Sequence, residues 1–557
     1  MLKHIERVPR LRIFRIPHQD HRHDLPDKDA VGSKAHYLMR MARRGLPVPP
    51  GFVLPTDLCR AYLKSGREAL HGLDTILEEE LEALGAHVGR RFGDSRRPLL
   101  FSVRSGATVS MPGMMETVLN VGLNSETMGG LLRMTGNPRL VQDCRRRLVS
   151  QYGEVVHGIA PAAFMARQKA LLAANAVADC SDLDSDGLRA LAEAFEEIFQ
   201  VETGHVFPVV PRVQLMGAIE AVLASWSSAR AQSYRAMNAI ADDLGTAVVV
   251  QTMAFGNLGP ASGSGVGFTR NPSDGRPEIY GDFVANAQGE DVVAGRRRAE
   301  DLTGLEQRAP DAYRKLVAAC AELESEFGDM QDFEFTVEEG QLLMLQCRPG
   351  KRTPLAALRI AHDLILEKRL APADGLRLLE GIILDGVKDE RLDLPPDAAP
   401  IARGKAAGLG VAVGAAVFSP ARVTEVRHRS GTAILICKTA ETNDIAALAE
   451  AAALVTAEGA RTSHAAVVAR QLNKPCIVGV EQLAIDEGGR SGTFGAIRIT
   501  EGDIVSLDCT KAAIYAGKFA IHASAPVTLV KDLKAWQKRV APAEHQVRKS
   551  RREGSST

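Results

Sequence analysis

His464 has the clearest capacity for covalent chemistry, because of the residues beside it. Thr462 and Ser463 are favourable N-cap residues, and the Ala/Val-rich run behind them predicts a helix that continues to Leu472. His464 would then lie in the first turn, where unpaired backbone N–H groups and the helix dipole stabilise a negative charge. This position suits an imidazole that carries a phosphoryl group. A capped helix with a partly buried histidine explains the local pattern as well.

A second candidate site lies in the segment 332–348. Apolar and polar residues alternate on both sides of a glycine-containing turn, which predicts a β-hairpin. The alternation places Asp332 and Glu334 on one face of the first strand, and it places Gln346 and Arg348 on one face of the second. If the two faces coincide, carboxylate and amide oxygens can bind Mg²⁺ beside an arginine that holds phosphate. The alternative is a half-exposed hairpin with ordinary surface polar residues.

Two further cations stand near predicted buried elements. Arg104 follows a predicted buried strand, 98–103, and we expect it at the strand's C-terminal end, entering a Gly/Ser loop. A guanidinium there can bind phosphate with two charge-assisted hydrogen bonds, although a structural salt bridge is the alternative. Lys34 opens a predicted helix over 35–44, but the spacing is not that of a Walker A loop. The pattern alone indicates that Lys34 is a surface lysine.

A second predicted buried strand, 246–251, ends at Gln251 and leads to Met253. Gly263 and Gly265 follow in a glycine-rich stretch. Glycines of this kind permit close approach of the backbone to phosphate groups, but glycine-rich turns are common and carry little weight alone.

Several stretches resemble, in the family's order, the pyruvate phosphate dikinase and phosphoenolpyruvate synthase family. The stretch 458–479, EGARTSHAAVVARQLNKPCIVG, resembles its phosphohistidine signature. Within it, Arg461 is closer to the synthases and Ser463 is closer to the dikinases. Asp282 stands where the family's wording leads us to expect glutamate. The other stretches that carry the resemblance are GLPVPPGF at 45–52, SVRSGA at 102–107, SMPGMM at 110–115, NAQGEDVVAG at 286–295 and LQCRPGKRT at 345–353.

The resemblance implies a role for each candidate residue. It implies that His464 is the phosphoryl carrier, and that Arg104 and Arg348 act with it in catalysis. Thr462 is a candidate for regulatory phosphorylation. The residues implied to hold ATP are Lys34, Arg104, Gln251, Met253, Gly263, Gly265, Asp332, Glu334, Gln346 and Arg348. The ligands implied for Mg²⁺ are Asp332, Glu334 and Gln346.

A chain of 557 residues is long enough for two or three domains. The resemblance implies an α/β and α+β multidomain fold, in which an ATP-grasp nucleotide-binding domain precedes a swivelling β/α phosphohistidine domain. The expected parts are an N-terminal extension at 1–28, the ATP-binding domain at 29–353 with a helical insertion at about 120–235, a helical linker and hinge at 354–400, the phosphohistidine domain at 401–518, and a linker remnant with a short helix and a basic tail at 519–557.

In the mechanism that the resemblance implies, His464 attacks the β-phosphorus of ATP and releases AMP, and orthophosphate or water then cleaves the pyrophosphohistidine. The phosphoryl group is destined for pyruvate, to give phosphoenolpyruvate. No stretch like the family's pyruvate-binding barrel follows residue 520, so we expect a separate domain or subunit to supply it. The alternatives are a non-catalytic regulatory paralogue that binds nucleotide, and a phosphohistidine kinase for another acceptor, similar to rifampin phosphotransferases.

Composition restricts the partners. Lys plus Arg equals Asp plus Glu at 68 each, so no overall charge attracts nucleic acid or an acidic membrane. No apolar run approaches the roughly 18 residues that a membrane span needs. The eight cysteines are scattered without a C-x-x-C pair, which fits a reducing compartment. We expect a cytoplasmic enzyme that binds neither nucleic acid nor membranes, with a homodimer as a candidate assembly.

Overall fold

The computed structural model describes residues 11–17, 25–109, 111, 114–293, 300–440, 444–459, 461, 464–472, 474–486 and 488–553. The chain divides into two compact units. The N-terminal unit comprises residues 1–258 with 343–347, and the C-terminal unit comprises 259–342 with 348–557. The division falls inside the stretch 29–353 that the sequence predicts as one domain. The domain boundaries given above therefore stay predictions.

An antiparallel sheet forms the centre of the N-terminal unit, with strand order β1-β2-β7-β5-β6. The strand predicted at 246–251 is confirmed as β7, and its apolar residues are buried, as a central strand requires. The strands are β1 (Phe14–Ile16), β2 (Gly51–Leu54), β5 (Phe101–Ala107), β6 (Thr117–Val121) and β7 (Thr246–Thr252), with a separate pair β3 (Arg91–Phe92) and β4 (Pro98–Leu99).

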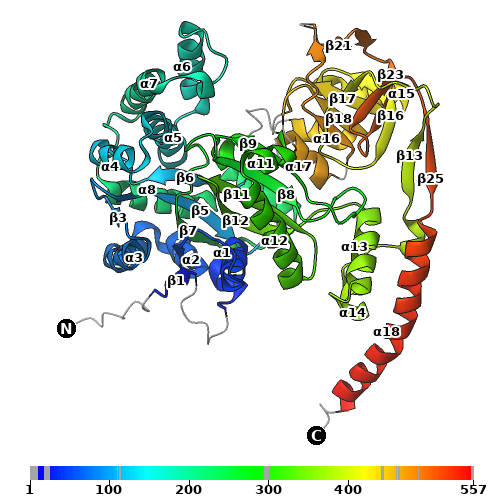
Figure 1. The fold of residues 1–557 in the computed structure, drawn as a ribbon, viewed down its shortest axis with the longest axis horizontal. Coiled ribbons are helices and arrows are strands. Elements are labelled where there is room, and N and C mark those ends of the chain that lie inside the picture. The colour runs from blue at the N-terminus through cyan, green and yellow to red at the C-terminus, as the bar shows by residue number, and fades with distance from the viewer. Residues whose placement is uncertain are drawn as a thin grey trace. The chain divides into compact units, whose positions relative to one another are not determined.

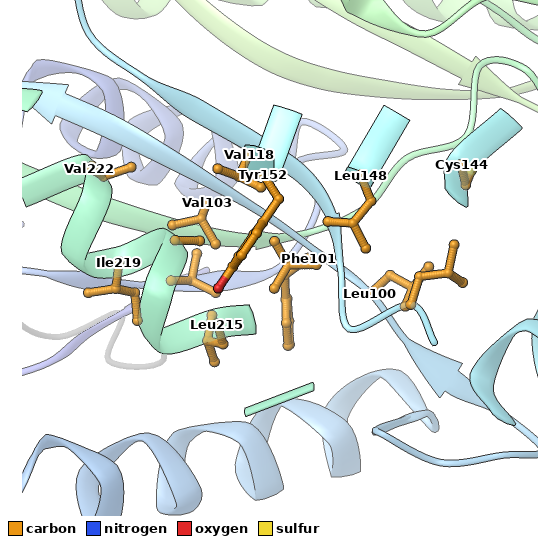
Figure 2. Close-up of a cluster of buried hydrophobic side chains, with 14 of the residues drawn as sticks. Leu100, Phe101, Val103, Val118, Cys144, Leu148, Tyr152, Leu215, Ile219 and Val222 are labelled. Atoms are coloured by element: carbon orange, nitrogen blue, oxygen red, sulfur yellow. The ribbon is translucent and has the colours of Figure 1, made fainter. Parts of the chain in front are cut away.

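Helices cover this sheet, and those between β6 and β7 occupy the stretch predicted as a helical insertion (Figure 1). Side chains from β5, β6, α5 and α8 meet in one apolar core, where Phe101, Val103, Tyr152 and Leu215 are buried (Figure 2). The helices are α1 (Lys28–Arg43), α2 (Thr56–Ser65), α3 (Leu73–Val88), α4 (Ser125–Thr135), α5 (Pro138–His157), α6 (Pro161–Ala174), α7 (Ser185–Thr203), α8 (Pro211–Ser225) and α9 (Ala229–Met237).

The C-terminal unit begins with a sheet of order β10-β9-β8-β11-β12. The hairpin predicted at 332–348 is confirmed as β11 and β12, and both turn residues, Glu339 and Gly340, have positive φ, as the common two-residue hairpin turn requires. The elements here are β8 (Gly263–Phe268), β9 (Tyr280–Ala285), α10 (Gly289–Val293), β10 (Glu300–Asp301), α11 (Leu302–Arg308), α12 (Pro310–Phe327), β11 (Gln331–Glu338) and β12 (Gln341–Pro349).

The segment after this sheet packs against the end of the chain. Helices α13 (Pro354–Leu366) and α14 (Pro372–Arg377) contact α18 (Val527–Glu553), and β13 (Asp389–Asp393) pairs with β25 (Ala520–Ser524) (Figure 1). The short helix predicted after residue 520 is wrong, because α18 has 27 residues. Apolar residues of α18 pack against α13 and α14, and Leu533 among them is fully buried.

A β/α module follows, built on an eight-stranded sheet of order β14-β24-β23-β16-β17-β18-β19-β15. Strands β16 to β19 are parallel neighbours joined by helical crossovers, the last of which contains α17 (His464–Gln471). The other elements are β14 (Ala402–Arg403), β15 (Lys405–Ala406), β16 (Val411–Val417), α15 (Val423–Ser430), β17 (Ala433–Cys437), α16 (Ile445–Glu450), β18 (Ala453–Thr456), β19 (Cys476–Val478), β20 (Leu483–Ile485), β21 (Ser491–Phe494), β22 (Ile497–Thr500), β23 (Ile504–Asp508) and β24 (Ala513–Ala516).

All eight cysteines are buried free thiols. Among the described residues, no helix has both the length and the apolar character that crossing a bilayer requires.

Gly32 interrupts α1 and lets it approach β5. Its φ of 74° and ψ of 164° lie outside the helical region, and a Cβ atom at this position would overlap the carbonyl oxygen of Gly106. The adjacent Ser33 hydroxyl donates to the carbonyl oxygen of Ala107 at 2.7 Å. The regular part of the helix, which carries Lys34, therefore depends on glycine at position 32.

We expect Gly32→Ala to lower the free energy of unfolding by about 3 kcal/mol or more, because backbone strain adds to a steric clash with a central strand. Urea unfolding measures this. The control is Gly89→Ala, at a residue with φ of 66° and ψ of 26° that caps α3 with no atom within 4 Å of the added methyl. Its loss should be about 1 kcal/mol. Equal losses would contradict the role given to the close approach.

Candidate functional site

In the N-terminal unit, the structure brings Lys34 and Arg104 onto neighbouring elements. A Cβ atom on Gly106 of β5 would lie 3.7 Å from the Cβ of Lys34 in α1. Arg104 lies inside β5, opposite Val249 of β7, and not at the end of the strand as predicted. The strand continues through Ala107 because β7 pairs with it along its whole length.

Gln251 and Met253 are anchored by structural hydrogen bonds. The Gln251 side chain is 1% exposed, and its Nε2 donates to the carbonyl oxygen of Pro49 at 2.8 Å. The Met253 backbone N–H donates to the carbonyl oxygen of Leu100 at 2.9 Å. These hydrogen bonds hold the backbone at the C-terminal end of β7 in place. The contribution of Gln251 and Met253 to nucleotide binding stays a prediction.

Gly263 and Gly265 lie within β8, which pairs with β9 and β11 on its two sides. Cβ atoms at these glycines would overlap the rings of Phe283 and Phe335. The packing of these rings therefore requires glycine at both positions, whatever their role towards phosphate.

The predicted faces of the hairpin coincide at Asp332 and Arg348. The Arg348 Nε donates to the Asp332 Oδ2 at 2.9 Å, and both side chains are partly exposed. The side chain of Glu334, two residues along the same face, forms no hydrogen bond or ion pair with any residue that the structure describes. Gln346 belongs to the run 343–347 that is grouped with the N-terminal unit, so its position relative to Glu334 stays a prediction.

The donor set predicted for Mg²⁺ fits that ion in its chemistry. Glu334 offers a carboxylate without a partner among the described residues, and Asp332 keeps a second oxygen beside the one that Arg348 contacts. Mg²⁺ commonly takes one or two carboxylates and completes its shell with phosphate oxygens and water. Across the described part of the chain, no group of three or more His, Cys, Asp or Glu side chains is arranged to hold a metal alone.

Two cations near this pair were not predicted. Lys351 is exposed, but partial desolvation lowers its pKa, which the nearby Arg348 and Arg470 lower further. Burial likewise lowers the pKa of Arg470, which the charge of Asp332 opposes. Arg470 also lies over the ring of Phe268, 5.8 Å from its centroid. Both residues stand in stretches that carry the family resemblance, but charge and spacing alone did not distinguish them from surface residues.

Arg348, Lys351 and Arg470 therefore form a cationic cluster, in which Arg348 contacts Asp332 and the other two cations lie close enough to Arg348 for its charge to lower their pKa. Three positive charges near one carboxylate repel one another unless an anion joins them. A polyphosphate, which carries several negative oxygens, matches this arrangement.

His464 is the first residue of α17, so the predicted helix and the place of His464 in its first turn are confirmed. Thr462 and Ser463 lie outside the described residues, as does the side chain of His464. The predicted N-cap and the candidate regulatory role of Thr462 thus stay predictions.

Comparisons with known proteins match both halves of the chain. Residues 69–315 and 305–368 match the family described as pyruvate phosphate dikinase, AMP/ATP-binding domain, and residues 430–512 match PEP-utilising enzyme, mobile domain. The chain is 40% identical over 512 residues to pyruvate, phosphate dikinase 1, chloroplastic, of Arabidopsis thaliana, covering 91% of this chain and 53% of that protein. It is 40% identical over 493 residues to pyruvate, phosphate dikinase of Clostridium symbiosum, covering 88% and 56%. The chain spans about half the length of these relatives.

We expect Lys351→Gln to make the protein more stable and to weaken its binding of ATP. The folded chain protonates this lysine less readily than the unfolded chain does, so its charge opposes folding at neutral pH. Thermal unfolding should show a gain of up to about 1 kcal/mol, the scale of a partly exposed charge pair. Calorimetry should show ATP binding weakened by roughly tenfold or more, as for a lost charge-assisted hydrogen bond.

The matched control is Lys388→Gln, at an exposed lysine of the linker. It should change neither quantity. Unchanged ATP binding in Lys351→Gln would contradict a role for the cationic cluster in holding phosphate.

Proposed function

The chain belongs to the pyruvate phosphate dikinase family, and from this we propose that it is an ATP-dependent phosphotransferase that phosphorylates its own His464. The observation that carries the proposal is the pairing of two parts in one chain. One part matches an AMP/ATP-binding domain, and the other matches a mobile domain in which a helix begins at the signature histidine. The first is an ATP-grasp domain, and the second swivels.

In the proposed reaction, an imidazole nitrogen of His464 attacks the β-phosphorus of ATP. The bond between the α–β bridging oxygen and the β-phosphorus breaks, and AMP leaves with that oxygen. Orthophosphate then attacks the γ-phosphorus and leaves as pyrophosphate, so that a single phosphoryl group stays on His464. In the synthase-like variant, water takes the place of orthophosphate.

The cations of the chain hold the phosphates during this transfer. Lys34 and Arg104 act from the N-terminal unit, and Arg348 acts from the hairpin with Lys351 and Arg470. Because Asp332 already holds the Arg348 guanidinium at 2.9 Å, little reorganisation is needed as charge develops. Glu334, with Asp332 and Gln346, would bind Mg²⁺, which neutralises charge on the phosphate oxygens when it is present.

The phosphoryl group on His464 then passes to pyruvate, which is converted to phosphoenolpyruvate on a separate domain or subunit. This part of the proposal rests on the activity after which the relatives are named, pyruvate, phosphate dikinase. A carrier histidine of this kind is useful only if a second site removes its phosphoryl group.

We expect ATP labelled at the β-phosphate to place an acid-labile, base-stable label on His464 in the presence of Mg²⁺. His464→Asn should lose the label and keep its affinity for ATP, because the substitution removes the nucleophile and leaves the cations in place. Mass spectrometry of peptides prepared under alkaline conditions identifies the labelled residue. An acid-stable label confined to Thr462 or Ser463 would refute the proposed carrier.

We expect Glu334→Ala and Arg348→Ala each to slow AMP formation by about 100-fold or more, as removal of one preorganised electrostatic contact to a transition state does. Rapid-quench measurement of AMP in a single turnover tests this. Arg308→Ala is the matched control, because Arg308 pairs with Glu300 at 2.9 Å on the surface of the same unit. Near-normal AMP formation in either site variant would place the ATP site elsewhere.

A further inference from the structure

Arg461 stands three residues before His464, and its side chain reaches the strand β9. Its Nη1 donates to Asp282 Oδ1 at 2.8 Å, to the carbonyl oxygen of Gly281 at 3.1 Å and to Asp301 Oδ1 at 3.1 Å. Its backbone N–H donates to the second oxygen of the Asp282 carboxylate at 3.3 Å. One carboxylate thus holds both the main chain and the side chain of the residue that leads into α17.

The pair is buried, which makes each partner depend on the other. The Asp282 side chain has no exposed surface, and the Arg461 side chain is 15% exposed. Arg461 also lies over the ring of Tyr280, 4.4 Å from its centroid, and the Tyr280 hydroxyl donates to the carbonyl oxygen of Ala406 at 2.8 Å. Removing one member of this buried pair weakens the contact, even though the Lys405 Nζ lies 3.9 Å from Asp282 Oδ1 and Asp301 stays beside Arg461, so the contact is sensitive to substitution.

The strand register connects this pair to the proposed Mg²⁺ ligand. Asp282 lies directly opposite Val266 of β8, and Val266 lies directly opposite Glu334 of β11. Residues opposite each other in an antiparallel sheet project from the same face, so Asp282 and Glu334 share one face, two strands apart, or about 10 Å. Arg461, three residues before His464, is therefore held on the face that carries Glu334.

A second arginine holds the other end of the same helix. Arg470, in the last turn of α17, lies over Phe268, and Phe268 is directly opposite Asp332 in the sheet. Its Nη1 also donates to the carbonyl oxygen of Ala407 at 3.3 Å. Arg470, in the last turn of α17, and Arg461, three residues before its first residue, thus both contact the sheet.

We propose that Arg461 is a positioning residue for phosphorylation of His464, and that it acts by locking the start of α17 onto Asp282, in the strand row that contains Glu334. The proposal rests on the proposed function of His464. Asp282, which stands where a glutamate is expected, has in this chain the role of anchoring the carrier segment. A nucleophile placed about 1 Å from its productive position reacts up to about 100-fold more slowly, so an anchor this close to His464 controls the rate of attack.

The test is a single-turnover measurement on the full chain with saturating Mg-ATP, comparing Arg461→Met, Asp282→Asn and the double variant. Each single variant should form phosphohistidine about 10- to 100-fold more slowly, with unchanged affinity for ATP. The double variant should be no slower than the slower single variant, because the two residues act as one unit. Arg461→Lys should recover part of the rate, since it restores a positive charge beside Asp282.

The matched control is Arg422→Met, which breaks the 2.8 Å contact between Arg422 and Glu501 inside the β/α module. It should phosphorylate His464 at the wild-type rate. An equal slowing in this control, or a slowing explained by weaker ATP binding, would overturn the proposal by reducing Arg461 to a general stabilising residue.

The proposed function of His464 and the positioning role of Arg461 can be refuted separately. If the wild-type chain forms no phosphohistidine, the proposed function is wrong. If the wild-type chain forms it and Arg461→Met does so at the same rate, only the positioning role is wrong. Should Arg461→Met not fold, Asp282→Asn, in which a neutral side chain of the same shape replaces the carboxylate, decides between these outcomes alone.

Discussion

The arrangement of the C-terminal unit depends on the pairing of buried charges. A guanidinium that leaves water must find a carboxylate, because an unpaired ion in a protein interior is strongly destabilising. Arg270 is 2% exposed and makes two hydrogen bonds to Glu324, at 2.9 and 3.0 Å, which tie the end of β8 to α12. Asp282 does the same for the segment before His464. Near the hairpin the charge of Arg348 lowers the pKa of both Lys351 and Arg470, and a polyphosphate can neutralise the positive charge of all three.

The sheet that carries these groups has aromatic rings on one face, and carboxylates among apolar side chains such as Val266 and Val284 on the other. Gly263 and Gly265 lie against phenylalanine rings from β9 and β11, so one face is closed by aromatic packing. On the opposite face, the row from Asp282 through Val266 to Glu334 contributes carboxylates. The glycines therefore support the site indirectly. Because the rings occupy the space above β8, the sheet packs closely on one side and leaves the acidic side chains to act on the other.

Local periodicity allowed the hairpin, the strand β7 and the start of α17 to be predicted, because each is specified by residues close in the sequence. The failures have long-range causes. Arg104 appeared to leave its strand, since Ser105 and Gly106 resemble a loop, but pairing with β7 extends β5 past them. The apolar residues at the beginning of α18 pack against helices far away in the chain. The pair Arg461–Asp282 joins residues 179 positions apart, so no local pattern could reveal it.

A phosphoryl carrier that serves two sites needs an anchor that positions it and can also be released. The chain passes through β13 before the module that holds His464 and through β25 after it. These two strands pair with each other along five residues. This pairing joins the two connections into one two-stranded ribbon. Ion pairs suit such an anchor, because they are directional when buried and water replaces them once the surfaces separate. Asp301, whose side chain is 65% exposed, already gives water access to one edge of the contact with Arg461. The contact of Arg461 therefore has a solvent-exposed side, at Asp301, from which separation can begin. Its buried side, at Asp282, sets the position of the nucleophile.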